Sequence, residues 1–159
     1  MTITTNQPAV IDEGTFSVHR SIRIAATVSK VWEAVTVPEH ISRWFGHTQL
    51  AGQGAGATGT VSWPGRDAIP LRVEAIDPER MVAYRWNNDD ASGIFPEAFE
   101  AGSSTLFTFT LEPVDGGTQL TVVETGFEVT SDAAENLARH QQGWTSELDK
   151  LVAFLESRS

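Results

Sequence analysis

The stretch from Asp132 to Glu156 constrains the fold of this chain more than any other part of the sequence. Its apolar and semi-polar residues recur at steps of three and four, which places them on one face of a helix. They are Leu137, Gln141, Trp144, Leu148, Leu151, Val152 and Leu155. Asp132 can cap the first turn, and Glu135 three residues later completes a capping-box-like pair. The pattern predicts one long amphipathic helix whose apolar stripe has to lie on another element.

Gly143 stands in the middle of this predicted helix, directly before Trp144. A glycine in a helix interior costs about 1 kcal/mol relative to alanine. We therefore expect close packing or a bend at Gly143 to compensate for that cost.

The composition is that of an ordinary globular chain, with 159 residues of which 40% are hydrophobic and 20% charged. This length suits one domain with a sizeable core. The formal net charge of -10 would repel a phosphate backbone and an anionic membrane surface, so we expect neither nucleic acid nor a membrane as partner. No apolar run approaches the roughly 18 residues of a membrane span. Without cysteine, the chain has no disulfide, thiolate nucleophile or zinc–cysteine site.

Residues 1–14 lack the positive region and the apolar core of a signal peptide, so we expect a cytoplasmic protein. The Thr, Asn, Pro and Gly content of these residues predicts a loosely held, flexible tail. Residues 15–159 are then expected to form a single domain.

Alternating residues predict a first strand over 15–25, with a phase change near Arg20 and Ser21. Two short helices follow. Ser29 is the expected cap of the first, and Pro38 begins the second. The buried stripe of the second helix consists of Ile41, Trp44 and Phe45.

Most of the remaining chain has the pattern of strands joined by short turns. The predicted strands cover residues 58–63, 69–76, 81–87, 104–112 and 118–127. The glycine-rich stretch 51–59 matches neither a phosphate-binding nor a dinucleotide-binding motif, so we interpret it as a turn between edge strands. This order predicts an α+β fold, in which a curved antiparallel sheet of about six or seven strands wraps around the long C-terminal helix. The two short helices after the first strand would fill the open end.

Three motifs resemble a known family. VWEAVTVPEHISRWF, residues 31–45, is similar to its W-x-A-[LV]-T-x-P-[ED]-x-[IL]-x-x-W-[FW] stretch. ETGF, residues 124–127, and HQQGWTSELDKLVAFL, residues 140–155, are similar to its E-x-G-F and G-W-x-x-x-L-x-x-L motifs. The family is the START-like, or SRPBCC, superfamily, with the helix-grip fold of the birch pollen allergen. Within it the chain resembles single-domain homologues of the C-terminal domain of the activator of the heat-shock chaperone ATPase.

The resemblance implies a cavity between the sheet and the long helix. Its expected ligand-binding residues are Trp44, Phe45, Trp86, Phe107, Phe109, Gln141, Trp144 and Leu148. Aromatic rings suit such a cavity because they stack on planar or sterol-like ligands, and the alternative is that they simply fill the core. The Gln141 amide would contact a ligand, a strand backbone or a water.

The sequence assigns no catalytic residue, metal or cofactor. No metal-ligand spacing or serine nucleophile motif is present. His140 borders the apolar stripe and is interpreted as a structural histidine. Glu124 would join Arg72, Glu74 and Arg85 in a polar cluster if the strands register that way. Alternation leaves open which face of the last strand points inward.

We therefore expect a small soluble binding protein for a hydrophobic or aromatic small molecule. One alternative is a polyketide-cyclase-like or hydrolytic enzyme that uses His140, Gln141 or Glu124. Another is an interaction module that modulates a chaperone, although the activator's separate chaperone-engaging domain has no counterpart in these residues. A homodimer is compatible with either kind of function.

Overall fold

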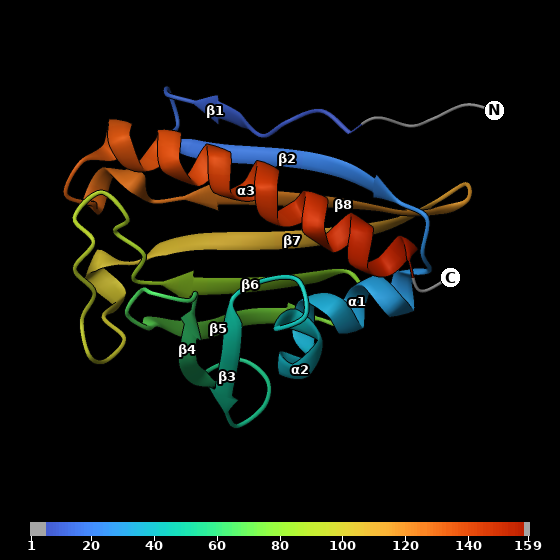
Figure 1. The fold of residues 1–159 in the computed structure, drawn as a ribbon, viewed down its shortest axis with the longest axis horizontal. Helices are drawn as coiled ribbons and strands as arrows, with labels where there is room; N and C mark the ends of the chain where they lie inside the picture. Colours follow the sequence, from blue (N-terminus) through green and yellow to red (C-terminus); the bar gives the residue numbers. More distant parts are fainter. Residues whose placement is uncertain (1–5, 158–159) are drawn as a thin grey trace.

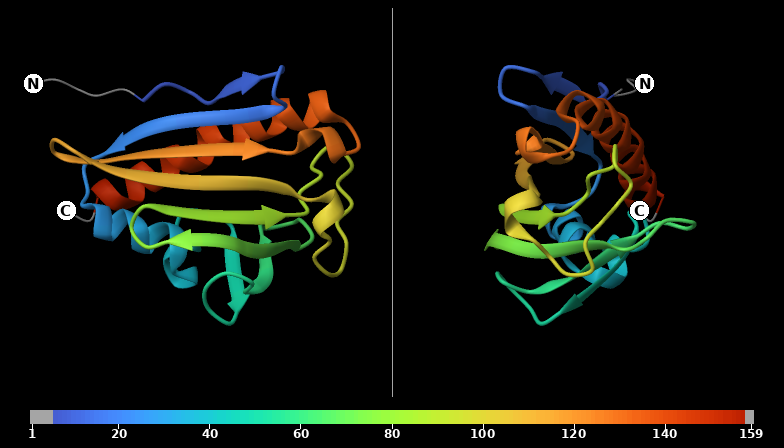
Figure 2. Two further views of the ribbon diagram at one scale, coloured as in Figure 1. Left: turned by 180° about the vertical axis from the view of Figure 1, so that it is seen from behind. Right: turned by 90° about the vertical axis from the view of Figure 1, so that its left-hand side faces the viewer.

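The computed structural model describes residues 6–157, in which a long helix lies on the concave face of an antiparallel sheet (Figures 1 and 2). The sheet has eight strands in the order β1-β2-β8-β7-β6-β5-β4-β3. The strands are β1 (Val10–Asp12), β2 (Ser17–Ile24), β3 (His47–Ala51), β4 (Thr58–Ser62), β5 (Ile69–Asp77), β6 (Met81–Trp86), β7 (Thr105–Val114) and β8 (Gly117–Thr125). The helices are α1 (Val28–Thr36), α2 (Pro38–Ile41) and α3 (Ala133–Glu156), with short 3-10 helices η1 (Ala101–Ser103) and η2 (Phe127–Val129). The predicted α+β class and helix-grip arrangement are confirmed, and the sheet has more strands than the six or seven expected.

Helix α3 forms where the sequence pattern places it. The Asp132 side chain accepts a hydrogen bond from the Glu135 amide at 3.1 Å, which caps the first turn. The buried positions are Asn136, Leu137, His140, Trp144, Leu148, Leu151 and Leu155. In Figure 1 the helix crosses β2, β8 and β7 diagonally, and its last turns lie near α1. Side chains of α3 also reach the other half of the sheet, because the Trp144 ring lies 6.1 Å from that of Trp86 on β6 between centroids.

Both strands that the sequence did not predict lie at the edges of the sheet. Val10–Asp12 pair with Ser17–His19 of β2, so this part of the expected tail is an ordered strand. Residues 1–5 of that tail lie outside the described residues. Strand β3 pairs with β4 over His47–Ala51, just before the glycine-rich turn. Edge strands of three and five residues carry too little alternation to be recognised.

Strand β2 continues through Arg20 without the expected phase change. Val18, Arg20 and Ile22 are all buried on the same face. The guanidinium of Arg20 is tolerated there because each side of it has an acceptor: the carbonyl of Gln7 at 2.8 Å, that of Thr145 at 2.9 Å and the Asp149 carboxylate at 2.7 Å. This one side chain ties β2, α3 and the segment before β1 together.

Helices α1 and α2 close one end of the sheet. The side chain of Thr27, rather than the expected Ser29, caps α1 by accepting from the Lys30 amide at 3.3 Å. The indole of Trp44 donates to the Ala34 carbonyl at 2.8 Å and fixes the chain after α2 against α1. The two short helices are consequently fixed to one another at this end of the sheet.

Candidate functional site

A pocket of about 300 Å³ opens between the middle of α3 and the ends of β4 and β6. Aromatic rings line one part of it and charged or polar groups the rest. The lining residues are Phe45, Trp63, Arg66, Trp86, Asn88, Asp90, Arg139, His140, Gly143, Trp144, Ser146 and Glu147. The volume lies at the lower end of the range for small-molecule sites.

The aromatic wall consists of rings that contact one another. Phe45 lies 5.8 Å from Trp144 and 5.9 Å from Trp86 between ring centroids, with interplanar angles of 10° and 23°. Trp63 meets Phe45 edge-on at 4.9 Å, and its indole donates to Glu147 on α3 at 3.1 Å. The wall is therefore supported from the sheet and from the helix.

The carboxylate of Glu124, which is fully buried at the end of β8, fixes two of these rings. Its Oε1 accepts from the Trp144 indole at 2.8 Å, and its Oε2 accepts from the Trp86 indole at 2.8 Å. The Thr105 hydroxyl donates to Oε2 at 2.6 Å, and His140 Nδ1 lies 2.8 Å from Oε1. Four donors saturate an ionised carboxylate, which can only accept. The inward face of β8 is thus the one that carries Leu120, Val122 and Glu124.

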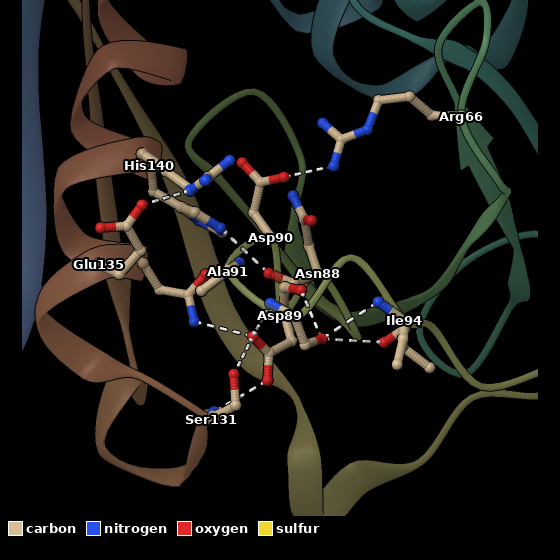
Figure 3. Close-up of polar contacts among 12 residues, drawn as sticks. Arg66, Asn88, Asp89, Asp90, Ala91, Ile94, Ser131, Glu135 and His140 are labelled. Atoms are coloured by element: carbon tan, nitrogen blue, oxygen red, sulfur yellow. Dashed lines mark hydrogen bonds and ion pairs between the residues drawn. The ribbon is translucent and has the colours of Figure 1, made fainter.

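His140 forms a buried ion pair with Glu124. Its Nδ1 donates to the carboxylate, and its Nε2 lies 3.1 Å from the backbone carbonyl of Asn88, which can only accept (Figure 3). Both ring nitrogens therefore carry protons. Burial alone would lower the pKa of His140, but the charge of Glu124 and the hydrogen bond to it raise that pKa above its ordinary value. Burial alone would raise the pKa of Glu124, but the charge of His140 and the donated hydrogen bonds lower it.

The loop after β6 forms one side of the pocket and is fastened to the start of α3 (Figure 3). The Asp89 carboxylate accepts from the Ser131 amide and hydroxyl, each at 2.8 Å, and from the Asn136 side chain at 2.9 Å. Although burial would raise the pKa of Asp89, these hydrogen bonds lower it. Asp90 pairs with Arg66 from the β4–β5 turn, across the mouth of the pocket. The loop is therefore held on both sides.

Only some of the predicted site residues meet at this pocket. Phe45, Trp86 and Trp144 line it. Trp44, Phe107 and Phe109 pack with Phe45 around a residual void of about 10 Å³, about the space of a single water. Leu148 is fully buried. Gln141 donates to the Ala9 carbonyl at 2.8 Å, so it holds the segment before β1.

Among the remaining lining residues, His140 was named only for the alternative enzyme, and the others were not predicted. On α3 a signal did exist, because Arg139, Gly143, Ser146 and Glu147 follow helical spacing and form a second stripe beside the apolar one. Trp63 and Asn88 carry no such signal. Trp63 directly follows the last residue of β4, and Asn88 lies two residues after the end of β6. The direction of each side chain depends on how the sheet curves, which the local sequence does not show.

Close packing, one of the two expected compensations for Gly143, is wrong. A Cβ at Gly143 would meet no atom within 4 Å, so the glycine is not required by close packing and instead faces the pocket. The other expected compensation, a bend, stays a prediction. The expected cluster of Glu124 with Arg72, Glu74 and Arg85 does not form. Glu74 accepts from Arg72 at 2.8 Å and forms an ion pair with Arg85 at 3.2 Å, whereas Glu124 lies on the opposite face of the sheet.

Within residues 6–157, no group of three or more His, Asp or Glu side chains is arranged to hold a metal ion. No helix in this described part is both long and apolar enough to cross a membrane.

A helix-grip fold with a pocket beside its C-terminal helix defines a protein of the START-like, or SRPBCC, class. The chain belongs to the family described as "Activator of Hsp90 ATPase homolog 1-like protein", whose sequence model matches residues 25–156. The resemblance found in the sequence is thereby confirmed.

Solved structures of similar fold support this assignment. Protein MLL2253 from Mesorhizobium loti is 23% identical with a TM-score of 0.74, over 90% of this chain and 98% of that one. DynU16, from the dynemicin biosynthetic locus, is 26% identical with a TM-score of 0.72, over 90% of this chain and 48% of that one. The Aha1 dimer from Colwellia psychrerythraea is 19% identical with a TM-score of 0.69, over 88% of this chain and 96% of that one. A comparison with curated proteins finds no match.

Proposed function

We propose that this protein binds a hydrophobic or aromatic small molecule in the pocket beside α3. The observation that carries the proposal is the pocket of about 300 Å³ with Phe45, Trp63, Trp86 and Trp144 in its lining. Aromatic side chains bury a large area against a ligand at little conformational cost. The similarity to a protein of a biosynthetic locus is in keeping with a small-molecule ligand.

Preorganisation of the wall supports binding. The indoles of Trp86 and Trp144 are held from behind by Glu124, so their rings do not have to be ordered when a ligand arrives. Binding to a preformed surface loses less free energy to ordering than binding to a mobile one. The buried ion pair with His140 thus maintains a binding surface while leaving the space in front of it open.

An enzymatic function is the alternative, because His140 also lines the pocket. Both of its ring nitrogens already donate, to Glu124 and to the Asn88 carbonyl. A cyclase-like proton transfer would require that carbonyl to move away first, and we assign no reaction. An NMR titration in which a ligand releases His140 Nε2 from Asn88 would favour the enzyme.

Isothermal titration calorimetry with a panel of planar aromatic and aliphatic compounds tests the proposal. We expect Trp63→Ala to weaken binding of the aromatic compounds by about tenfold, which is about 1.4 kcal/mol. The matched control is Trp32→Ala, because Trp32 is also half-buried but lies on α1 outside the pocket. If no compound binds the wild type, or if both variants weaken binding equally, the proposal is wrong.

A further inference from the structure

Gly143 leaves space in the pocket at a cost to the helix. It lies in the interior of α3, where glycine lowers helix stability relative to alanine. No atom lies within 4 Å of the position that its Cβ would occupy, so packing does not require the glycine. A side chain at this position would instead project into the pocket that Gly143 lines. The open space is therefore the evident consequence of having glycine here.

Three of the four rings around this space are inclined to one another by 33° or less, and the fourth, Trp63, stands edge-on to Phe45. Phe45 makes interplanar angles of 10° with Trp144 and 23° with Trp86, and the two indoles lie 33° apart. A flat molecule can stack along this common orientation and extend over the bare helix backbone at Gly143. A bulky or branched molecule gains less from such a surface.

Asn88 adds a polar group to the same pocket. Its backbone carbonyl accepts from His140, one helical turn before Gly143, and this contact fixes the residue beside the opening (Figure 3). The side chain of Asn88, unlike its carbonyl, has no partner. Among the side-chain nitrogen and oxygen atoms buried within residues 6–157, only Asn88 Oδ1 lacks a hydrogen bond. Buried amides normally have partners, and rotation of a carboxamide by 180° exchanges its donor and acceptor.

The geometry points to a planar aromatic ligand that carries a hydroxyl group. Its ring lies over the helix backbone at Gly143, and its hydroxyl meets the Asn88 carboxamide. The Oδ1 atom itself is buried, whereas the amide nitrogen of the same group is not among the buried atoms without a partner, so the nitrogen position is the end that a ligand can reach. A hydroxyl both donates and accepts, so it can pair with this end in either orientation of the carboxamide. This inference rests on the proposed function and specifies the class of ligand that the pocket takes.

Titration calorimetry with naphthalene, 2-methoxynaphthalene and 2-naphthol tests the polar contact. We expect the wild type to bind 2-naphthol about tenfold more tightly than naphthalene, although naphthalene is the more hydrophobic compound. The preference should disappear in Asn88→Leu, which keeps the backbone carbonyl and the approximate volume. Asn88→Leu should fold normally, because the side chain it replaces makes no hydrogen bond within the protein.

The substitutions Gly143→Ala and Gly143→Leu test the position of the ring. We expect thermal stability to rise or stay level while affinity for 2-naphthol falls, by at least about tenfold for Gly143→Leu. Gln142→Leu is the control, because Gln142 is the exposed neighbour on the same helix and does not line the pocket. A residue with a purely structural role would change stability and affinity together.

The outcomes separate the two proposals. Binding of naphthalene and 2-naphthol with equal affinity, or binding unaffected by Asn88→Leu and Gly143→Leu, would overturn the inference and leave the proposed function standing. A wild type that binds none of these compounds, and none of the wider panel, would overturn the proposed function itself.

Discussion

The two halves of α3 cover the same sheet by different means. The C-terminal half buries Leu148, Leu151 and Leu155 in the hydrophobic core, and its last turns lie near α1 (Figure 1). The N-terminal half contributes His140 and Trp144, which are positioned by hydrogen bonds to Glu124 beside an open pocket. Dispersion needs close contact on every side, whereas a directed hydrogen bond holds a ring from one side only. A pocket can therefore stay open beside His140 and Trp144, because hydrogen bonds to Glu124 hold these side chains in place.

Glu124→Ala should have the largest effect on this comparison. It leaves His140 as an uncompensated buried charge and removes the acceptor of two indoles. We expect a loss of about 5 kcal/mol in the free energy of unfolding, measured by urea denaturation. Glu124→Gln keeps the shape and should lose less. A loss below about 2 kcal/mol for the alanine variant would show that the N-terminal half does not depend on its polar anchor.

Leu148→Ala makes the corresponding change in the other half. Leu148 is fully buried, so truncation should cost about 3–4 kcal/mol through lost contacts and a residual cavity. Because Leu148 does not line the pocket, ligand affinity in the calorimetric assay should stay unchanged. A parallel loss of affinity would indicate that the two halves are coupled.

The dependence of stability on pH should come from the N-terminal half. The raised pKa of His140 means that its contribution is fully present below about pH 6.5 and is lost as pH rises through the folded-state value. The lowered pKa of Glu124 means that its contribution is present above about pH 4.5 and is lost as pH falls through the folded-state value. Urea unfolding should therefore show a decline above pH 6.5 of up to about 1.4 kcal/mol per pH unit.

The two halves provide the control for this pH effect. Leu148→Ala should keep the decline above pH 6.5, because it leaves the Glu124–His140 pair intact. His140→Gln should remove it. A decline that persists in His140→Gln would assign the pH dependence to other groups.

Arg66→Ala should have the smallest effect. The ion pair of Arg66 with Asp90 lies at the pocket mouth with the arginine side chain 44% exposed, so its loss should cost less than about 1 kcal/mol. Asp89→Ala removes several charge-assisted hydrogen bonds to Ser131 and Asn136 at the start of α3 and should cost about 2 kcal/mol. Equal losses in thermal denaturation would mean that the exposed pair, and not Asp89, holds the loop.

Periodicity was sufficient to predict the elements that bury a continuous stripe. Strand β7 alternates through Phe107 and Phe109, and α3 repeats apolar residues through Leu148 and Leu155, so both are visible in the sequence. Arg20 was harder to interpret, because a buried guanidinium in phase with Val18 depends on acceptors far away in sequence.

The pocket depends on contacts that no local pattern encodes. Glu124 lies 16 residues from His140 and 38 from Trp86, and only the pairing of β8 with its neighbours brings these groups together. Trp144 was predicted to face the sheet, and it does, but whether it bordered solid core or open space depended on Gly143 beside it. The spacing of apolar residues in a helix predicts which face is apolar, but it does not predict how much of that face other side chains cover.

The segment before β2 has a consequence for solubility. Strand β1 pairs with only three residues at one end of β2, and further along the Asn6 side chain accepts from the Arg23 amide at 2.9 Å and donates to its carbonyl at 3.2 Å. The Asn6 carboxamide thus satisfies the backbone N–H and C=O of Arg23, as a neighbouring strand would. An uncovered strand edge is a template for pairing with another molecule. Residues 6–12 cover this edge of β2 at both ends, so we expect their removal to expose β2 to self-association.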